Sequence, residues 1–268
     1  MSGQSAGLIA ELRTRIAAFE GAGNATGESA SGVVSLGSPF DDVLPGGGLR
    51  RNALHEIAAA DYRDMGAGIG FVAALAAHFA DASSSAPLLW CEGGRVSLDM
   101  GGLYGPGLAA FGLDPARLVL IAAAREVELL WVLEEALRLG AFAAVVGEID
   151  GRTKALDLVA TRRLQLAAEE GGTPLLLFTG HESADASVAV TRWRVAAAPG
   201  SPGSRFAGQS MELVGRPRWN AKLERCRGAE SGATWLVEWD VGRRKLSTPD
   251  RKLRDSGMRR EEMLELAG

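Results

Sequence analysis

The sequence over 126–149 is EVELLWVLEEALRLGAFAAVVGEI, a helical pattern followed at once by a continuous apolar run. Gly140 supplies the residue type that commonly ends a helix, and the run over 142–150 fits a strand covered on both faces. This stretch therefore predicts one helix–strand unit of a parallel sheet. The apolar residues of its helix recur at helical spacing, namely Val127, Leu130, Leu133 and Leu137.

The same alternation extends in both directions from this unit. Apolar runs predict strands over 86–92, 115–123 and 173–181, and helical patterns cover 69–80 and 154–172. Strands that alternate with helices are typical of a mainly parallel sheet with helices on both faces. The fold class we expect is therefore α/β.

Beyond residue 185 the apolar residues follow a period of two, which indicates antiparallel strands. One predicted strand places its apolar and polar residues on opposite faces, as in the sets Trp219, Ala221, Leu223 and Arg218, Asn220, Lys222. The segment GAESG, 228–232, then predicts a hairpin turn into the last strand. We expect the parallel sheet to finish in antiparallel C-terminal strands.

Composition shifts divide the chain into four parts. We expect an N-terminal amphipathic helix over 1–20, a Gly/Ser-rich linker over 21–32, the α/β core over 33–242 and a charged tail over 243–268. The helix could dock on its own core or on a neighbouring protein. The tail is expected to be mobile or partly helical.

Composition also excludes several classes of protein. The chain has 268 residues, a formal net charge of -4, two cysteines and three histidines, so it carries no disulfide framework and no histidine–cysteine metal pattern. Its first residues do not form a signal peptide, and no apolar run approaches the roughly 18 residues of a membrane span. We expect a cytoplasmic protein with no membrane association, no metal and no cofactor.

Four phrases follow one another in a characteristic order: FDDVLPGGGLRRNALHEIAA (40–59), LYGPGLAAFGLDPARLVLI (103–121), EALRLGAFAAVVGEI (135–149) and TRRLQLAAEEGGTPLLLFTGH (161–181). Their order and spacing resemble the RecA-like ATPase core over about residues 35–240. The resemblance implies a RecA-like core with a phosphate loop after the strand that contains Glu56 and Ile57.

Within that superfamily the sequence resembles the ImuA family in three further features. These are a degenerate phosphate loop, the segment TRWRV at 191–195, and the end strands PRWNAKLERCRG and TWLVEWDV. Membership would imply a role in damage-induced translesion DNA synthesis, within the SOS response. The implied partners are an ImuB-type, catalytically inactive Y-family polymerase homologue and an error-prone polymerase. The resemblance also implies contact with RecA.

The phosphate-loop segment lacks the residues that bind phosphate and Mg²⁺ in a working loop. A working loop, G-x-x-x-x-G-K-[ST], uses glycine to bring backbone N–H groups to phosphate, Lys to neutralise oxygens and a hydroxyl to hold Mg²⁺. The corresponding segment here is AAADYRDMGAGIG, 58–70. Read without gaps, it places Asp64 at the second Gly, Met65 at the Lys and Gly66 at the Ser/Thr. The remaining glycines are expected to serve a tight strand-to-helix turn.

The other positions important for hydrolysis also lack the expected residues or carry them out of register. Gly147 stands where the resemblance places a Mg²⁺-bridging Asp, and Glu148 is one residue out of register. Glu92 could orient water but fits a strand-end carboxylate as well, and His181 fits a surface loop. We therefore expect no catalytic residue and no hydrolysis.

Basic residues gather on the predicted antiparallel strands, where a shared face could bind phosphates. The alternative is an ordinary solvated sheet face, and weak DNA binding is left open. The candidate surface consists of Arg192, Arg194, Arg216, Arg218, Lys222, Arg225 and Arg227. Candidate contacts in the tail are Arg251, Lys252, Arg254, Arg259 and Arg260.

Three functional hypotheses remain. The first is a non-catalytic RecA-like adaptor of the ImuA type that binds its partners through the helix, the basic strands or the tail. The second is a RecA-superfamily ATPase with an atypical nucleotide site. The third is a SulA-like cell-division inhibitor, since that family is also a RecA-like relic.

Overall fold

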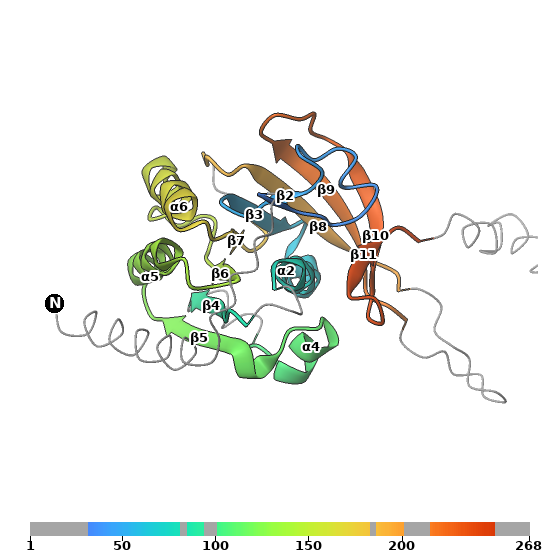
Figure 1. The fold of residues 1–268 in the computed structure, drawn as a ribbon, viewed down its shortest axis with the longest axis horizontal. Helices are drawn as coiled ribbons and strands as arrows, with labels where there is room; N and C mark the ends of the chain where they lie inside the picture. The colour runs from blue at the N-terminus through green and yellow to red at the C-terminus, as the bar shows by residue number, and fades with distance from the viewer. Residues whose placement is uncertain (1–31, 81–84, 94–100, 183–185, 201–214, 250–268) are drawn as a thin grey trace, which may run out of the picture.

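The main feature of the fold is a nine-stranded sheet (Figure 1). A computed structural model describes residues 32–80, 85–93, 101–182, 186–200 and 215–249. The order across the sheet is β11-β10-β9-β8-β3-β7-β6-β4-β5. These strands are β3 (Leu54–Ala59), β4 (Leu88–Gly93), β5 (Leu118–Ala123), β6 (Ala144–Glu148), β7 (Leu175–Phe178), β8 (Thr191–Ala198), β9 (Arg218–Cys226), β10 (Thr234–Asp240) and β11 (Lys245–Ser247).

The two halves of the sheet differ in strand direction, which confirms the expected α/β class. From β8 to β5 all neighbouring strands are parallel. Strands β9, β10 and β11 then add in antiparallel pairs, with a register irregularity between Arg192 and Trp193. A separate antiparallel pair joins β1 (Val33–Val34) to β2 (Leu49–Arg50).

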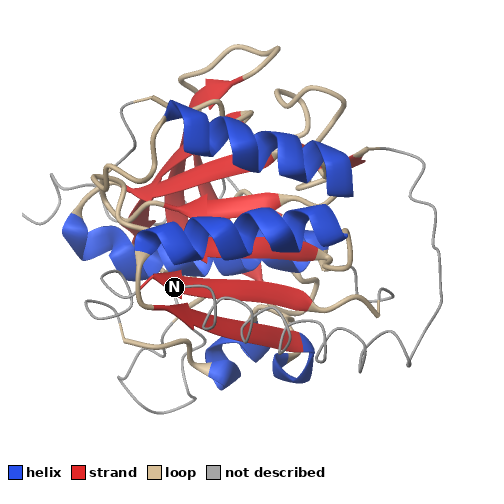
Figure 2. Ribbon diagram, turned by 90° about the vertical axis from the view of Figure 1, so that its left-hand side faces the viewer, coloured by secondary structure: helices blue, strands red, loops and turns tan. Residues whose placement is uncertain are grey.

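Helices cover both faces of the parallel half (Figures 1 and 2). The curved antiparallel strands wrap around α2 on one face, whereas α5 and α6 lie side by side on the other (Figure 1). The helices are α2 (Met65–Phe79), α4 (Gly105–Ala110), α5 (Glu126–Leu139) and α6 (Leu158–Gly171), with 3-10 turns η1 (Tyr62–Asp64) and η2 (Pro115–Arg117).

Each face of the sheet has its own hydrophobic core. The core beneath α2 is rich in aromatic rings, and Phe71 packs there against both Trp193 and Trp219. The core beneath α5 and α6 is mostly aliphatic, with Leu133 and Leu164 fully covered. Large buried rings of this kind supply much of the stabilisation of a core.

The C-terminal strands confirm the period-two prediction. On β9 the side chains of Trp219, Ala221 and Leu223 are buried. Strand β9 pairs with β10 as a hairpin that turns between Cys226 and Thr234. The apolar face therefore joins the α2 core and the polar face points outward.

The predicted apolar face of α5 is only partly confirmed, since Leu133 and Leu137 are buried and Val127 is not. Val127 is 69% exposed at the start of α5, and Leu130 is only partly buried. Helix α5 has more apolar residues than fit on one face. Its sequence is therefore compatible with two apolar faces that are rotated slightly about the helix axis. The sheet covers the second of them, which consists of Leu129, Val132, Leu133, Ala136 and Leu137.

The boundary between core and tail also requires correction. Residues 245–247 form β11, which pairs with β10 through Leu246 and Trp239, so the sheet extends past residue 242. The predicted N-terminal helix and residues 250–268 lie outside the described residues, as does nearly all of the linker. Within the described ranges, no helix has both the length and the apolar character needed to cross a membrane.

Candidate functional site

The segment that corresponds to a phosphate loop is a short, closed turn. Strand β3 ends at Ala59, η1 follows after two residues, and α2 begins directly at Met65. The Asp61 carboxylate accepts a hydrogen bond from the Arg63 backbone N–H at 3.1 Å. An acidic side chain of the protein therefore caps the turn where a phosphate loop would offer N–H groups to an anion.

Asp64 closes the opposite side of this turn. Its Oδ1 accepts a hydrogen bond from the backbone N–H of Ala197 at 2.9 Å, so it links the turn to the end of β8. The Ala60 N–H donates to the Val195 carbonyl at 2.7 Å and so adds a second hydrogen bond between the turn and β8. The turn is thus held to the neighbouring strand by its own polar groups.

Met65, which the ungapped reading of the sequence places at a phosphate-binding Lys, is a core residue. It is 3% exposed. Its sulfur and terminal methyl lie beside Gly180, at 3.7 Å from the point that a Cβ there would occupy. The thioether therefore fills the space between α2 and the end of β7.

The glycine-rich run after Met65 is helical. Gly66 and Gly68 lie within α2, and neither has a positive φ. A Cβ at Gly68 would approach the Phe178 ring to 2.6 Å. Gly68 therefore allows α2 to pack closely on β7. The prediction that these glycines form the strand-to-helix turn is wrong, because they lie inside the helix that follows it.

Two carboxyl groups meet at the carboxyl end of the neighbouring strands. Glu92 on β4 and Glu148 on β6 are register partners. The Trp90 indole N–H donates to Glu148 Oε1 at 2.5 Å, and the Leu103 N–H donates to Glu92 Oε1 at 3.2 Å. Gly147 faces α5 instead, where a Cβ would meet Leu133 at 2.6 Å. The acid on the α2 face of β6 is therefore Glu148.

Burial controls the titration of Glu148. Desolvation raises the pKa of Glu148 to about 7, the hydrogen bond from Trp90 opposes that rise, and the charge of Glu92 adds to it. A raised pKa is compatible with proton transfer but equally with a structural carboxyl group. In the described part of the chain, no cluster of three or more His, Cys, Asp or Glu is placed to hold a metal.

His181 is only partly exposed. Its ring packs edge-on against Tyr62, with centroids 5.6 Å apart, and its Nε2 lies 3.5 Å from Glu182 Oε1. The Arg194 guanidinium donates to the backbone oxygens of His181 and Ala59 at 3.1 and 3.2 Å. One arginine from β8 therefore ties together the ends of β3 and β7.

The structure gathers the predicted basic residues and also gives them acidic partners. Arg194 pairs with Glu224 at 3.1 Å, and Arg218 pairs with Glu238 at 2.9 Å. Arg216 lies 3.0 Å from Asp240, and Arg192 lies 3.1 Å from Glu56. The Arg225 guanidinium donates to the Ser187 carbonyl, and the backbone N–H of Arg227 donates to the Val190 carbonyl at 2.8 Å. The outward face formed by β8, β9 and β10 therefore carries arginines and carboxylates side by side.

Sequence reasoning missed these acidic partners. Lys222 remains on the same face and is exposed. The period-two pattern places Glu224 and Glu238 on the same faces of their strands as the basic residues. That pattern could have predicted the acidic partners. The tail candidates from Arg251 to Arg260 lie outside the described residues.

The fold and the site together define a RecA-like α/β domain with a short, closed turn between β3 and α2. The solved structure of the RadB recombinase has the same fold, with a TM-score of 0.52 over 81% of this chain and 100% of that chain, at 16% identity. The chain belongs to the ImuA family. It is 35% identical over 219 residues to Protein ImuA from two strains of Caulobacter vibrioides, which covers 77% of this chain and 83% of the relative. No family profile matches the chain.

Proposed function

We propose that the protein is a non-catalytic RecA-like adaptor in damage-induced translesion DNA synthesis. Membership of the ImuA family supports this cellular role. The proposed partners are an ImuB-type Y-family polymerase homologue and an error-prone polymerase, together with RecA. The adaptor would contact them through its surfaces, with no turnover of nucleotide.

The observation that carries the proposal is the closed turn after β3. Met65 is buried beside Gly180 where a lysine would contact phosphate, and the Asp61 and Asp64 carboxylates already accept backbone N–H groups. Phosphoryl transfer depends on positioned cations and a metal ion. Two carboxylates at this turn would instead repel a nucleotide triphosphate.

A RecA-superfamily ATPase with an atypical site is the second candidate. Glu92 and Glu148 favour it, because they lie side by side on the α2 face at the carboxyl edge of the sheet. Such an enzyme would need a cation other than a phosphate-loop lysine. The Arg63 side chain is 90% exposed, and its Nε lies 3.4 Å from Asp61 Oδ1.

Calorimetric titration with Mg·ATP tests the choice between these candidates. We expect no saturable heat for the natural chain. The variant Met65→Lys should also fail to bind and should lose about 3 kcal/mol of stability, because the new ammonium group would be buried. The control Met65→Leu should cost less than about 1.5 kcal/mol. Saturable binding together with turnover that Glu148→Gln abolishes would establish the ATPase instead.

Capture experiments test the partners. The full chain should retain the two polymerase proteins without nucleotide, and Met65→Leu should retain them equally. Retention of the cell-division protein FtsZ alone would favour the SulA-like inhibitor. Loss of all capture on a folded chain would overturn the adaptor.

A further inference from the structure

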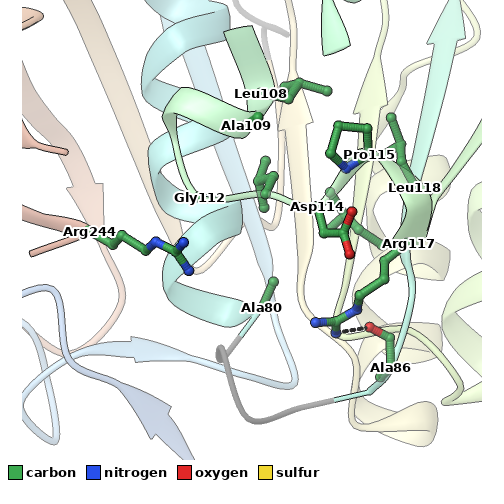
Figure 3. A pocket seen from close by; sticks show the side chains of 12 residues that line it. Ala80, Ala86, Leu108, Ala109, Gly112, Asp114, Pro115, Arg117, Leu118 and Arg244 are labelled. Atoms are coloured by element: carbon green, nitrogen blue, oxygen red, sulfur yellow. Dashed lines mark hydrogen bonds between the residues drawn. The ribbon is translucent and has the colours of Figure 1, made fainter. Parts of the chain in front are cut away.

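A cavity of about 430 Å³ lies at the opposite edge of the sheet from the closed turn (Figure 3). Strands β4 and β5 begin here, at Leu88 and Leu118, and α2 ends here, with its C-cap residue Ala80 in the cavity wall. Helix α4 and the turn that follows it complete the wall. The 15 residues of α2 separate the cavity from the closed turn, which is about 22 Å at the helical rise.

The floor of this cavity is apolar and its sides carry two arginines. Leu88, Leu108 and Leu118 line it, so it can accept an apolar side chain. Arg117 and Arg244 come from segments far apart in the sequence, and their guanidinium groups point into the same space from opposite sides (Figure 3). A site of this composition fits a ligand that is apolar at one end and negatively charged at the other.

Arg117 has donor capacity to spare. Its Nη2 donates to the Ala86 carbonyl. Its Nε is buried, has no hydrogen-bond partner among the described residues and is closed to a ligand, so a carboxylate in the cavity would contact the terminal nitrogens. A guanidinium group carries five N–H donors, and a carboxylate is the acceptor whose geometry matches it best.

Arg244 is held over the cavity by an uncommon backbone conformation. Its φ is 51°, and among the described residues it is the non-glycine residue with a positive φ. Its side-chain carbons pass over Gly112, where a Cβ would lie 2.7 Å from Cδ. Its guanidinium makes no hydrogen bond or ion pair with the described residues. Backbone conformations of this kind concentrate at functional sites.

Asp114 limits the charge that the cavity can accept. Its carboxylate lines the cavity while capping η2 through the Ala116 N–H at 2.9 Å. Two cations and one anion favour a ligand with a single negative charge. The leucine floor separates the two kinds of anion, because a carboxylate on an apolar segment can bury its apolar part there and inorganic phosphate has none.

We propose that this cavity binds an acidic–apolar peptide segment of a partner protein, with a Glu or Asp carboxylate between Arg117 and Arg244 and an apolar side chain on the leucine floor. The inference deepens the proposed adaptor function and depends on it for its biological use. The binding itself is independent of the closed turn, so its test does not depend on ATP.

The experiment is a nuclear magnetic resonance titration of the full chain with two peptides, acetyl-Leu-Glu-Leu-amide and acetyl-Leu-Gln-Leu-amide. We expect the glutamate peptide to shift the amide signals of Gly112 and Arg117 saturably. The glutamine peptide should bind about tenfold more weakly, because charge-assisted hydrogen bonds to arginine are lost. Inorganic phosphate, added alone, should bind more weakly than the glutamate peptide.

Variants locate the binding to the two arginines. Arg244→Gly should reduce affinity about tenfold while preserving the thermal unfolding midpoint, because glycine adopts a positive φ without strain. Arg117→Gln should reduce affinity similarly. The matched control Arg243→Ala changes an exposed neighbour outside the cavity lining and should bind as the natural chain does.

Three results would overturn the inference. These are the absence of a saturable shift, equal affinity for the two peptides, and tighter binding of phosphate than of the glutamate peptide. Any of these results would leave the adaptor function to be judged by partner capture. Conversely, Mg·ATP turnover would overturn the adaptor function without affecting the peptide titration.

Discussion

At the residue scale, the buried Glu148 should make the stability of the protein depend on pH. It is 3% exposed, and Trp90 donates to it. Its pKa is about 7 in the folded protein against 4.5 for the ordinary carboxyl group. Between these values the folded state holds the proton more tightly than the unfolded state does. The free energy of unfolding should therefore fall as pH rises through this window.

The variant Glu148→Gln tests this assignment. Glutamine can still accept from Trp90 but cannot ionise, so at pH 8 the variant should be about 1–3 kcal/mol more stable than the natural chain. At pH 5 the two should agree within about 0.5 kcal/mol. Urea unfolding at both values provides the measurement. Stability curves that run parallel from pH 5 to pH 8 would show that Glu148 is ionised in the folded state.

The buried His55 and the partly buried His78 determine how stability changes on the acid side of the same curves. Burial lowers the pKa of His55 and of His78 to about 4 from 6.5. Their contribution to stability is present above pH 6.5 and is lost as pH falls toward 4. Both proteins retain these histidines, so the difference between their curves isolates Glu148.

At the scale of elements, the contact between α2 and β7 explains the glycine pattern of the sequence. The run of glycines after Met65 resembles the remains of a phosphate loop, yet these residues are helical. Gly68 lets the helix approach Phe178 more closely than a side chain would permit. Close helix–sheet packing therefore accounts for Gly68 without a nucleotide.

Gly68→Ala should destabilise the protein by about 1–3 kcal/mol, because the new methyl group would overlap the buried Phe178 ring. This cost should outweigh the helix-propensity gain of roughly 1 kcal/mol. Gly66→Ala, on the exposed side of α2, should be neutral or stabilising. Thermal or urea unfolding measures both variants. Recovery by Phe178→Leu in the double variant would locate the strain, and a stabilised Gly68→Ala would contradict the packing argument.

At the scale of the whole molecule, the outward face of β8, β9 and β10 decides whether nucleic acid is a partner. Its arginines are paired with Glu224, Glu238 and Asp240 across neighbouring strands. Acidic side chains so close to the cations compete with phosphate. The formal net charge of -4 adds no attraction from the rest of the molecule.

We expect weak binding to duplex DNA at low salt, with a logarithmic salt slope no steeper than about -2. The double variant Glu224→Gln, Glu238→Gln leaves Arg194 and Arg218 without their acidic partners and should bind more tightly with a steeper slope. Fluorescence anisotropy at several salt concentrations measures both proteins. Tight binding by the natural chain, weakened by Lys222→Ala, would show that the face is a DNA surface as it stands.

The sequence by itself determined the alternation of helices and strands, the change to period two after residue 185 and the missing lysine at Met65, because each is a local pattern. Only the tertiary structure decided which stripe of α5 is buried, that Glu148 shares a face with α2, and that Arg194 meets Glu224. It also brought Arg117 and Arg244 to one cavity. Those features depend on how segments far apart in the chain pack, and periodicity along the chain carries no information about that pairing.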